Sequence, residues 1–227
     1  MNDSQRPANC NTNGPCAWCT IEFIALHVCI LGICGVLIGA LWVQFFEREF
    51  PCPLCLLQRM GMMLATLGPV FILAHGHRTR VQGFSVMGAG FGMSIIGAVA
   101  GMMMSTRQIL LHIEPGDPGY GTPVMGMHLY TWALVVFITI LVVSGLMLIF
   151  GREPVIRPSS PETADAIDAD PNFRPPMHWF TKLTFAIFGL IMLVNVVSAF
   201  FESGFNLFQD DNPTSYRLLE SKPESSE

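Results

Sequence analysis

The sequence predicts an all-α membrane protein with five transmembrane helices. Of its 227 residues, 51% are hydrophobic and only 13% are charged, and the mean hydropathy is +0.48. Residues 84–105 and 129–150 contain no charged side chain. A helix needs about 20 apolar residues to cross a bilayer, where lipid offers the backbone no hydrogen-bond partners. These observations favour a helical membrane fold over a soluble domain.

Five stretches have the length and composition of a membrane span. They are residues 23–46, 56–74, 84–105, 129–150 and 179–201. Around them the chain divides into an N-terminal tail over 1–22, a linker over 151–178 and an acidic C-terminal tail over 202–227. No short apolar segment followed by a small-residue cleavage site precedes the first span, so we expect that span to be retained.

Basic residues indicate the orientation of the spans. The short connection 75–80 has two arginines, and the connection 151–182 has four basic residues. The positive-inside rule assigns both connections to the cytoplasm. The tail 1–22 and the linker 151–178 are then cytoplasmic, whereas the turn after the first span, the connection 106–128 and the C-terminal tail face outward.

The third span contains two pairs of glycines four residues apart. Gly88 pairs with Gly92, and Gly97 pairs with Gly101. Small residues at this spacing let neighbouring transmembrane helices approach each other closely. We therefore expect close helix packing at both pairs.

A Cys-x-x-Cys pair, Cys52 and Cys55, lies between the first two spans in the segment Phe-Pro-Cys-Pro-Leu-Cys-Leu-Leu-Gln-Arg over residues 50–59. Two thiols at this spacing can form and reopen a disulfide. The alternative is a permanent structural disulfide. A bridge across so short a loop would restrict the unfolded chain little and would stabilise the fold only weakly. The spacing and position therefore favour redox chemistry.

The neighbouring residues favour a reactive thiolate. Pro53 suits the first position of a helix, which would place Cys55 in the first turn of the second span. Free amide groups and the helix dipole favour negative charge there. Arg59 follows Cys55 by four residues and should face the same side. An arginine at membrane depth needs a partner such as a thiolate; the alternative for Arg59 is an interfacial side chain that reaches water.

The other five cysteines lie in different surroundings. Cys29 and Cys34 are in the middle of the first span, where cysteine packs as a small apolar residue. Cys10, Cys16 and Cys19 are in the predicted cytoplasmic tail, where thiols are mostly reduced. The Cys16 and Cys19 pair is either inert, weakly metal-binding or redox-active, and no tail histidine is present to complete a zinc site.

The segment from Cys52 to Arg59, placed directly after a first span, resembles the DsbB family of disulfide bond formation proteins. These bacterial inner-membrane enzymes reoxidise the periplasmic thioredoxin-like oxidase DsbA and pass electrons to ubiquinone or menaquinone. The resemblance implies a DsbB-like four-helix transmembrane domain over 23–150, with 179–201 as an additional helix. It also implies a quinone-linked protein-disulfide oxidoreductase in the inner membrane, with the cysteine turn facing the periplasm and a DsbA-like partner.

The resemblance also assigns roles to individual residues. Cys52 matches the cysteine that exchanges with the partner, Cys55 matches the one beside the quinone, and Arg59 matches the arginine that polarises the quinone. The end of the third span resembles the quinone-proximal segment of the family, which makes Gln108 and His112 candidate quinone neighbours. The alternative for His112 is an ordinary interfacial loop histidine.

The chain departs from the family pattern in the connection 106–128. Typical members carry a second cysteine pair there that exchanges with DsbA, but this connection has no cysteine. Either the partner reaches Cys52 directly, or another protein supplies the missing thiols. Two other functions remain as alternatives: a transmembrane conduit for thiol reductant through Cys16 and Cys19, and a non-enzymatic membrane scaffold or metal-binding protein. The sequence contains no nucleotide-binding loop, protease triad or nucleic-acid patch.

Overall fold

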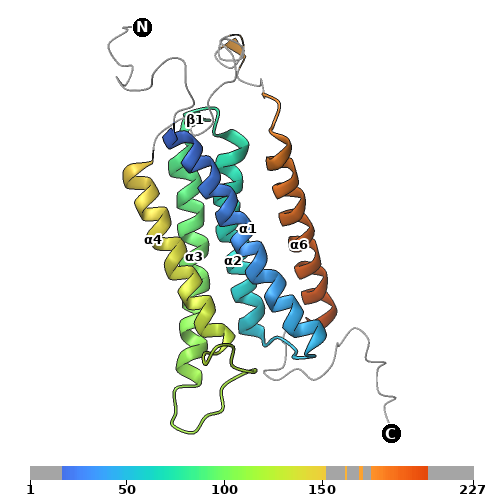
Figure 1. The fold of residues 1–227 in the computed structure, drawn as a ribbon. Coiled ribbons are helices and arrows are strands. Elements are labelled where there is room, and N and C mark those ends of the chain that lie inside the picture. Colours follow the sequence, from blue (N-terminus) through green and yellow to red (C-terminus); the bar gives the residue numbers. More distant parts are fainter. Residues whose placement is uncertain (1–16, 152–161, 163–168, 171–174, 204–227) are drawn as a thin grey trace, which may run out of the picture.

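The structure is a computed structural model that describes residues 17–151, 162, 169–170 and 175–203. In this part of the chain, five long helices form the fold (Figure 1). The helices are α1 (Ala17–Phe46), α2 (Pro53–His75), α3 (Val86–Leu111), α4 (Leu129–Phe150) and α6 (Trp179–Ser203). All five are long and apolar enough to cross a membrane. The prediction of an all-α, multi-pass membrane protein is therefore confirmed.

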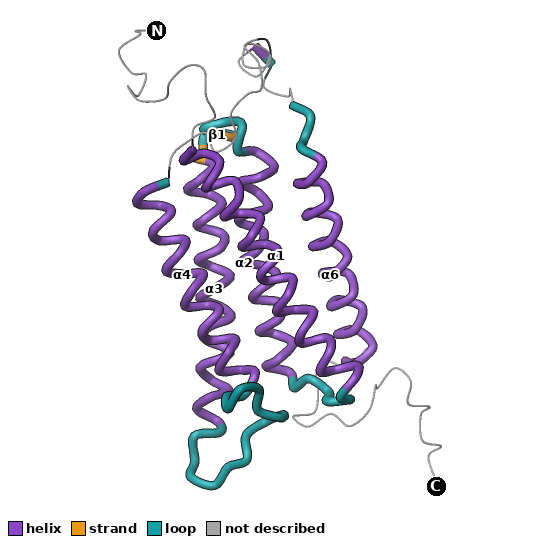
Figure 2. Tube along the Cα trace, in the orientation of Figure 1, coloured by secondary structure: helices purple, strands orange, loops and turns teal. Residues whose placement is uncertain are grey.

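The helices run up and down in a bundle, with α2 and α3 at its centre and α6 packed beside α1 (Figure 1). Figure 2 shows that the connection from α1 to α2 and the loop from α3 to α4 lie at the same end of the bundle. The C-terminal end of α6 lies there too. A hairpin of the two short strands β1 (Arg80–Val81) and β2 (Phe84–Ser85) lies at the opposite end. The sequence analysis assigned the turn after the first span and the connection 106–128 to one side of the membrane, and the two lie at one end of the bundle.

Apolar side chains from several helices fill the interior of the bundle. Ile30 and Leu37 of α1, Ile72 of α2 and Phe137 of α4 are fully buried. Cys34 belongs to the same core, and Cys29 is partly buried. Both cysteines lie among apolar neighbours, in agreement with the interpretation that they pack as small apolar residues.

Glycines set the distance between α2 and α3. A Cβ atom added to Gly61 of α2 would lie 2.9 Å from the Cα atom of Gly101, and one added to Gly97 would lie 2.8 Å from the Cα atom of Ala65. The predicted contact at Gly97 and Gly101 is therefore confirmed. The prediction for the other pair is wrong, because a Cβ atom at Gly92 would meet nothing within 4 Å and one at Gly88 would meet only Ser85 of its own helix cap.

Several helices extend beyond the predicted spans. The α1 helix begins at Ala17 rather than at residue 23, and α3 ends at Leu111 rather than at residue 105. Hydropathy marks only the apolar part of a helix, whereas backbone hydrogen bonding continues through polar residues as long as their side chains find partners. The extension of α3 matters most, because it holds Gln108 on a rigid helical face.

The last turn of α6 also differs from the prediction. The sequence places Glu202 at the start of an acidic tail, but α6 continues to Ser203 and the Glu202 side chain is buried, with 1% of its surface exposed. Its carboxylate accepts a hydrogen bond from the side chain of Gln44. Cys10, Cys16, most of the linker 151–178 and the tail after Ser203 lie outside the described residues.

The glycine contact predicts a specific sensitivity to substitution. The variant Gly97→Ala should be destabilised by about 1–3 kcal/mol, because its methyl group would overlap the α2 backbone. The matched variant Gly92→Ala should be neutral or more stable by up to about 1 kcal/mol, because alanine has the better helix propensity and the site is open. Thermal unfolding of the two detergent-solubilised variants checks this. Equal unfolding midpoints would contradict the described packing.

Candidate redox site

The Cys-x-x-Cys pair lies at the junction between α1 and α2. Both residues are free cysteines, and their sulfur atoms are 2.7 Å apart. Cys52 is buried, with 6% of its surface exposed, and Cys55 is partly buried. At this distance one thiol can donate a hydrogen bond to the other sulfur, and the pair is close enough to form a disulfide.

The local sequence fixes this arrangement through the start of α2. Cys52 has an extended backbone and is the N-cap residue, and Pro53 occupies the beginning of the helix as predicted. The Cys52 sulfur accepts a hydrogen bond from the backbone N–H of Cys55 at 3.2 Å. Cys55 therefore lies in the first turn of α2, where free amide groups and the helix dipole favour negative charge.

Two glutamines connect the sulfur pair to α3. The side-chain amide of Gln108 donates to the Cys52 sulfur at 3.1 Å and is 3.5 Å from the Cys55 sulfur. Its oxygen accepts from the amide of Gln58 at 2.7 Å. Both glutamines are buried. Because Gln58 holds the oxygen, the Gln108 nitrogen is directed towards the sulfurs, where it stabilises negative charge.

The environment of Cys52 favours the protonated thiol. The pKa of Cys52 is raised well above its usual range, mainly by the hydrogen bond with the Cys55 sulfur and further by burial. A raised pKa keeps a thiol protonated. Negative charge on the reduced pair therefore belongs on Cys55, the sulfur in the first turn of the helix.

Arg59 is held by α1. Its Nη1 atom donates to the side-chain oxygen of Gln44 at 2.7 Å, and its Nη2 atom donates to the backbone oxygen of Ala40 at 3.0 Å. The guanidinium and the Cys55 side chain line the same pocket, whose volume is about 110 Å³. The sequence suggested a thiolate as the partner of Arg59, whereas these two hydrogen-bond acceptors come from α1.

The loop between α3 and α4 closes this pocket from outside the bundle. Tyr120 lines the pocket, and its hydroxyl donates to the backbone oxygen of Phe50 at 2.6 Å. Burial raises the pKa of Tyr120, with a further contribution from nearby Cys52, so the hydroxyl keeps its proton as a donor. The backbone N–H of Thr122 donates to the Glu49 carboxylate at 3.2 Å. The loop is thus attached to the segment just before the cysteines.

His112 lies at the C-terminal end of α3 and faces this loop. Its Nδ1 atom is 3.1 Å from the carboxylate of Asp117. The pKa of Asp117 is lowered, first by the hydrogen bond from the backbone of Gly119 and then by the one from His112. The imidazole stacks on Tyr130, which lines the pocket. Of the two candidates from the third span, Gln108 therefore contacts the sulfurs directly, whereas His112 reaches the pocket only through Tyr130.

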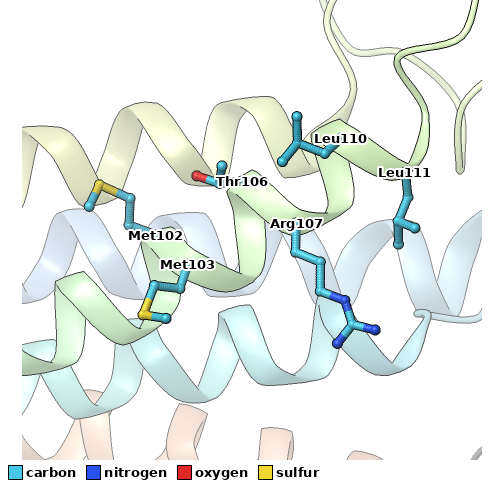
Figure 3. Close-up of a pocket in the computed structure, with 6 residues that line it drawn as sticks. All are labelled: Met102, Met103, Thr106, Arg107, Leu110 and Leu111. Carbon is cyan, nitrogen blue, oxygen red and sulfur yellow. The ribbon is translucent and has the colours of Figure 1, made fainter.

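A second hollow lies on the outer side of α3, with a volume of about 420 Å³. Figure 3 shows the side chains that line it, in two rows along the helix: Met102, Thr106 and Leu110, and Met103, Arg107 and Leu111. Most of these residues are exposed, whereas Gln108 on the opposite face is buried. This hollow contains no cysteine and does not belong to the redox site.

Sequence reasoning missed three residues of the site. Gln58 is part of the recognised motif but was given no role, Gln44 lies inside the first apolar span, and Tyr120 lies in the loop. A polar residue within a transmembrane helix signals function in general, so Gln44 and Gln58 could have been singled out. Nothing in the sequence distinguishes Tyr120, because its partner is a backbone oxygen distant along the chain.

The fold and site define a multi-pass helical membrane protein with a redox-capable cysteine pair at one end of its bundle. The family model "Disulfide bond formation protein DsbB" matches residues 22–122. A relative from Burkholderia lata, "Disulfide bond formation protein B 2", is 31% identical over 137 residues that cover 47% of this chain and 77% of the relative. The chain belongs to the DsbB family.

Other relatives match a shorter part of their own length. "Disulfide bond formation protein B" of Hahella chejuensis is 34% identical over 44% of this chain and 58% of the relative. The protein of the same name from Chromobacterium violaceum is 37% identical over 39% of this chain and 51% of the relative. The chain thus spans a little over half of these two relatives. No solved structure matches it. The matched segment 22–122 includes the cysteines, Arg59 and Gln108 but ends before α4 and α6.

The glutamine contact predicts the reactivity of the thiols. In the reduced protein, Gln108→Leu should slow alkylation of the Cys52–Cys55 pair about tenfold at fixed pH, because a hydrogen bond to a charged group contributes about 1.5 kcal/mol. Mass spectrometry of the peptide that contains both cysteines measures the rate. Thr106→Val, on the exposed face of the same helix, is the control and should leave the rate unchanged. Equal rates for the two variants would show that Gln108 does not stabilise the thiolate.

Proposed function

We propose that the protein is a quinone-dependent thiol–disulfide oxidoreductase that reoxidises a thioredoxin-like partner through Cys52 and Cys55. The observation that carries this proposal is the sulfur pair, 2.7 Å apart, of which Cys55 lines a pocket together with Arg59. Membership of the DsbB family supports the same reaction class.

The exchange reaction begins from the oxidised pair. A thiolate of the reduced partner attacks the Cys52 sulfur, the bond between Cys52 and Cys55 breaks, and Cys55 leaves as a thiolate. The second thiol of the partner then attacks the mixed disulfide, which releases Cys52 and oxidises the partner. The Gln108 amide, 3.5 Å from the Cys55 sulfur, would stabilise the departing Cys55 thiolate, and the raised pKa of Cys52 would keep a proton on that sulfur in the reduced pair.

The reduced pair must lose two electrons before it can act again. A bound ubiquinone or menaquinone would accept these electrons together with two protons. The pocket beside Cys55 suits a quinone ring, because it combines the Arg59 guanidinium with the aromatic side chains of Tyr120, Tyr130 and Trp132. Arg59 would favour the negative charge that develops on a reduced quinone oxygen.

An apolar groove adjoins this pocket. It has a volume of about 530 Å³, is lined by residues from α1, α2, α3 and α4, and shares Val36 and Trp132 with the pocket. An isoprenoid tail would fit such a lining, because the groove consists almost entirely of apolar side chains. A lipid-soluble acceptor would therefore reach the sulfurs from within the bilayer.

The proposed location is the bacterial inner membrane, with the cysteine turn facing the periplasm. The basic connections at the opposite end of the bundle support this orientation through the positive-inside rule. The proposed partner is a DsbA-like protein. Because the loop 112–128 has no cysteine, we propose that this partner exchanges directly with Cys52 rather than through a second cysteine pair.

Replacement of the electron-donating sulfur tests the reaction. Stopped-flow mixing of the purified protein with a reduced thioredoxin-like protein and ubiquinone should show quinone reduction for the wild type and none for Cys55→Ser, because the serine variant cannot form the disulfide. Cys34→Ser, a substitution in the middle of α1 that lines neither the pocket nor the groove, is the matched control and should retain turnover. Normal turnover without Cys55 would refute the mechanism.

Removal of the guanidinium tests the acceptor pocket. Arg59→Ala should reduce kcat/KM for ubiquinone by about tenfold to hundredfold, because a preorganised positive donor is lost where negative charge develops. The single-turnover reaction of the oxidised protein with the dithiol partner, followed without quinone, should change by less than about threefold. Loss of both reactions to the same extent would place Arg59 in the thiol exchange or in folding instead.

A further inference from the structure

The α6 helix reaches the redox site although it lies outside the segment that matches the family. It packs against α1 along the bundle, and its C-terminal end lies at the same end of the bundle as the connection from α1 to α2 (Figure 1). Its face towards α1 is polar at this end. Ser198 and Glu202, one helical turn apart, are both buried, with 5% and 1% of their surfaces exposed.

Three hydrogen bonds connect these two residues to Arg59. The amide nitrogen of Gln44 donates to the Ser198 hydroxyl at 2.8 Å and is 3.5 Å from a carboxylate oxygen of Glu202. The amide oxygen of the same Gln44 accepts from Arg59 at 2.7 Å. Gln44 is itself buried, with 2% of its surface exposed. A continuous chain of polar contacts therefore runs from α6 through α1 to α2.

The chemistry of an amide explains why α6 matters for Arg59. A glutamine side chain can present either its oxygen or its nitrogen in a given direction, but only the oxygen can accept from a guanidinium. Acceptors on α6 satisfy the Gln44 nitrogen, so the orientation with the oxygen towards Arg59 is favoured. Without these acceptors, the buried N–H group of Gln44 would have no hydrogen-bond partner on α6. Rotation of the amide, which exchanges its oxygen and nitrogen, would then become more favourable.

We propose that Ser198 and Glu202 are positioning residues, which hold the Arg59 guanidinium in its quinone-binding orientation by fixing the Gln44 amide. This inference rests on the proposed quinone reaction. It gives α6 a defined part in that reaction: the helix completes the acceptor site without contacting the sulfurs. Arg59 is anchored on one side by Ala40 and Gln44, and the anchor at Gln44 depends on α6.

Quinone binding without turnover provides the test. The full-length oxidised protein in detergent is titrated with a ubiquinone analogue that carries a decyl tail, and quenching of tryptophan fluorescence is followed, because Trp132 lines the pocket. Ser198→Ala and Glu202→Gln should each raise the apparent Kd about tenfold. The matched control is Thr184→Val, which removes a buried hydroxyl that donates to Phe180 within α6 and should bind quinone as the wild type does.

Kinetic measurements separate positioning from general damage. In Ser198→Ala and Glu202→Gln the KM for quinone should rise about tenfold. Their kcat at saturating quinone and the rate of the single-turnover reaction with a dithiol should change by less than about twofold. Thermal unfolding of every variant is compared with that of Thr184→Val. Ser198→Ala removes only one hydroxyl from the helix, so it maintains the test if Glu202→Gln folds poorly.

The Arg59→Ala background shows whether the effect passes through the arginine. If α6 acts by positioning Arg59, then Ser198→Ala should cause no further loss of quinone binding when Arg59 is absent. An equal loss in both backgrounds, or wild-type binding in both α6 variants, would overturn the inference. Failure of the wild type to show saturable quinone binding and quinone reduction would instead overturn the proposed function, and the inference with it.

Discussion

The positive charge of Arg59 is the constraint on which the polar end of this bundle depends. A guanidinium at the edge of a membrane domain must be hydrogen-bonded and electrostatically balanced, because lipid supplies neither water nor counterions. The α1 helix meets the first demand with Ala40 and Gln44, and α6 extends the arrangement with buried polar groups. Residues of α1, α2 and α6 thus form one polar network at this end of the bundle.

Packing in the middle of the bundle determines chemistry at its end. The glycine contacts between α2 and α3 hold these two helices close together. The side chains of Gln58 and Gln108 can therefore reach each other nearer the end of the bundle. That meeting is the hydrogen bond between Gln58 and Gln108, which directs an amide nitrogen towards the sulfurs. The reactivity of the cysteines therefore depends on the spacing of the helix pair as well as on their own sequence motif.

The sequence allowed prediction of features that depend on local spacing or composition. The five helices, the start of α2 at Pro53 and the placement of Cys55 in its first turn all follow from such signals. Contacts between helices could not be predicted, because hydropathy does not specify which face of one helix meets another. The contact of Gln108 with the sulfurs was therefore not foreseen, and Glu202 was expected in a tail but is buried against α1.

The attachment of the loop between α3 and α4 has a consequence for access to Cys52. Tyr120 and Thr122 are joined to the segment before the cysteines by hydrogen bonds and not by covalent links. Hydrogen bonds break and re-form by thermal motion alone, whereas a disulfide tether would need a chemical reaction to release it. The attachment of this loop beside the cysteines can therefore open and close in the dithiol and in the disulfide form alike.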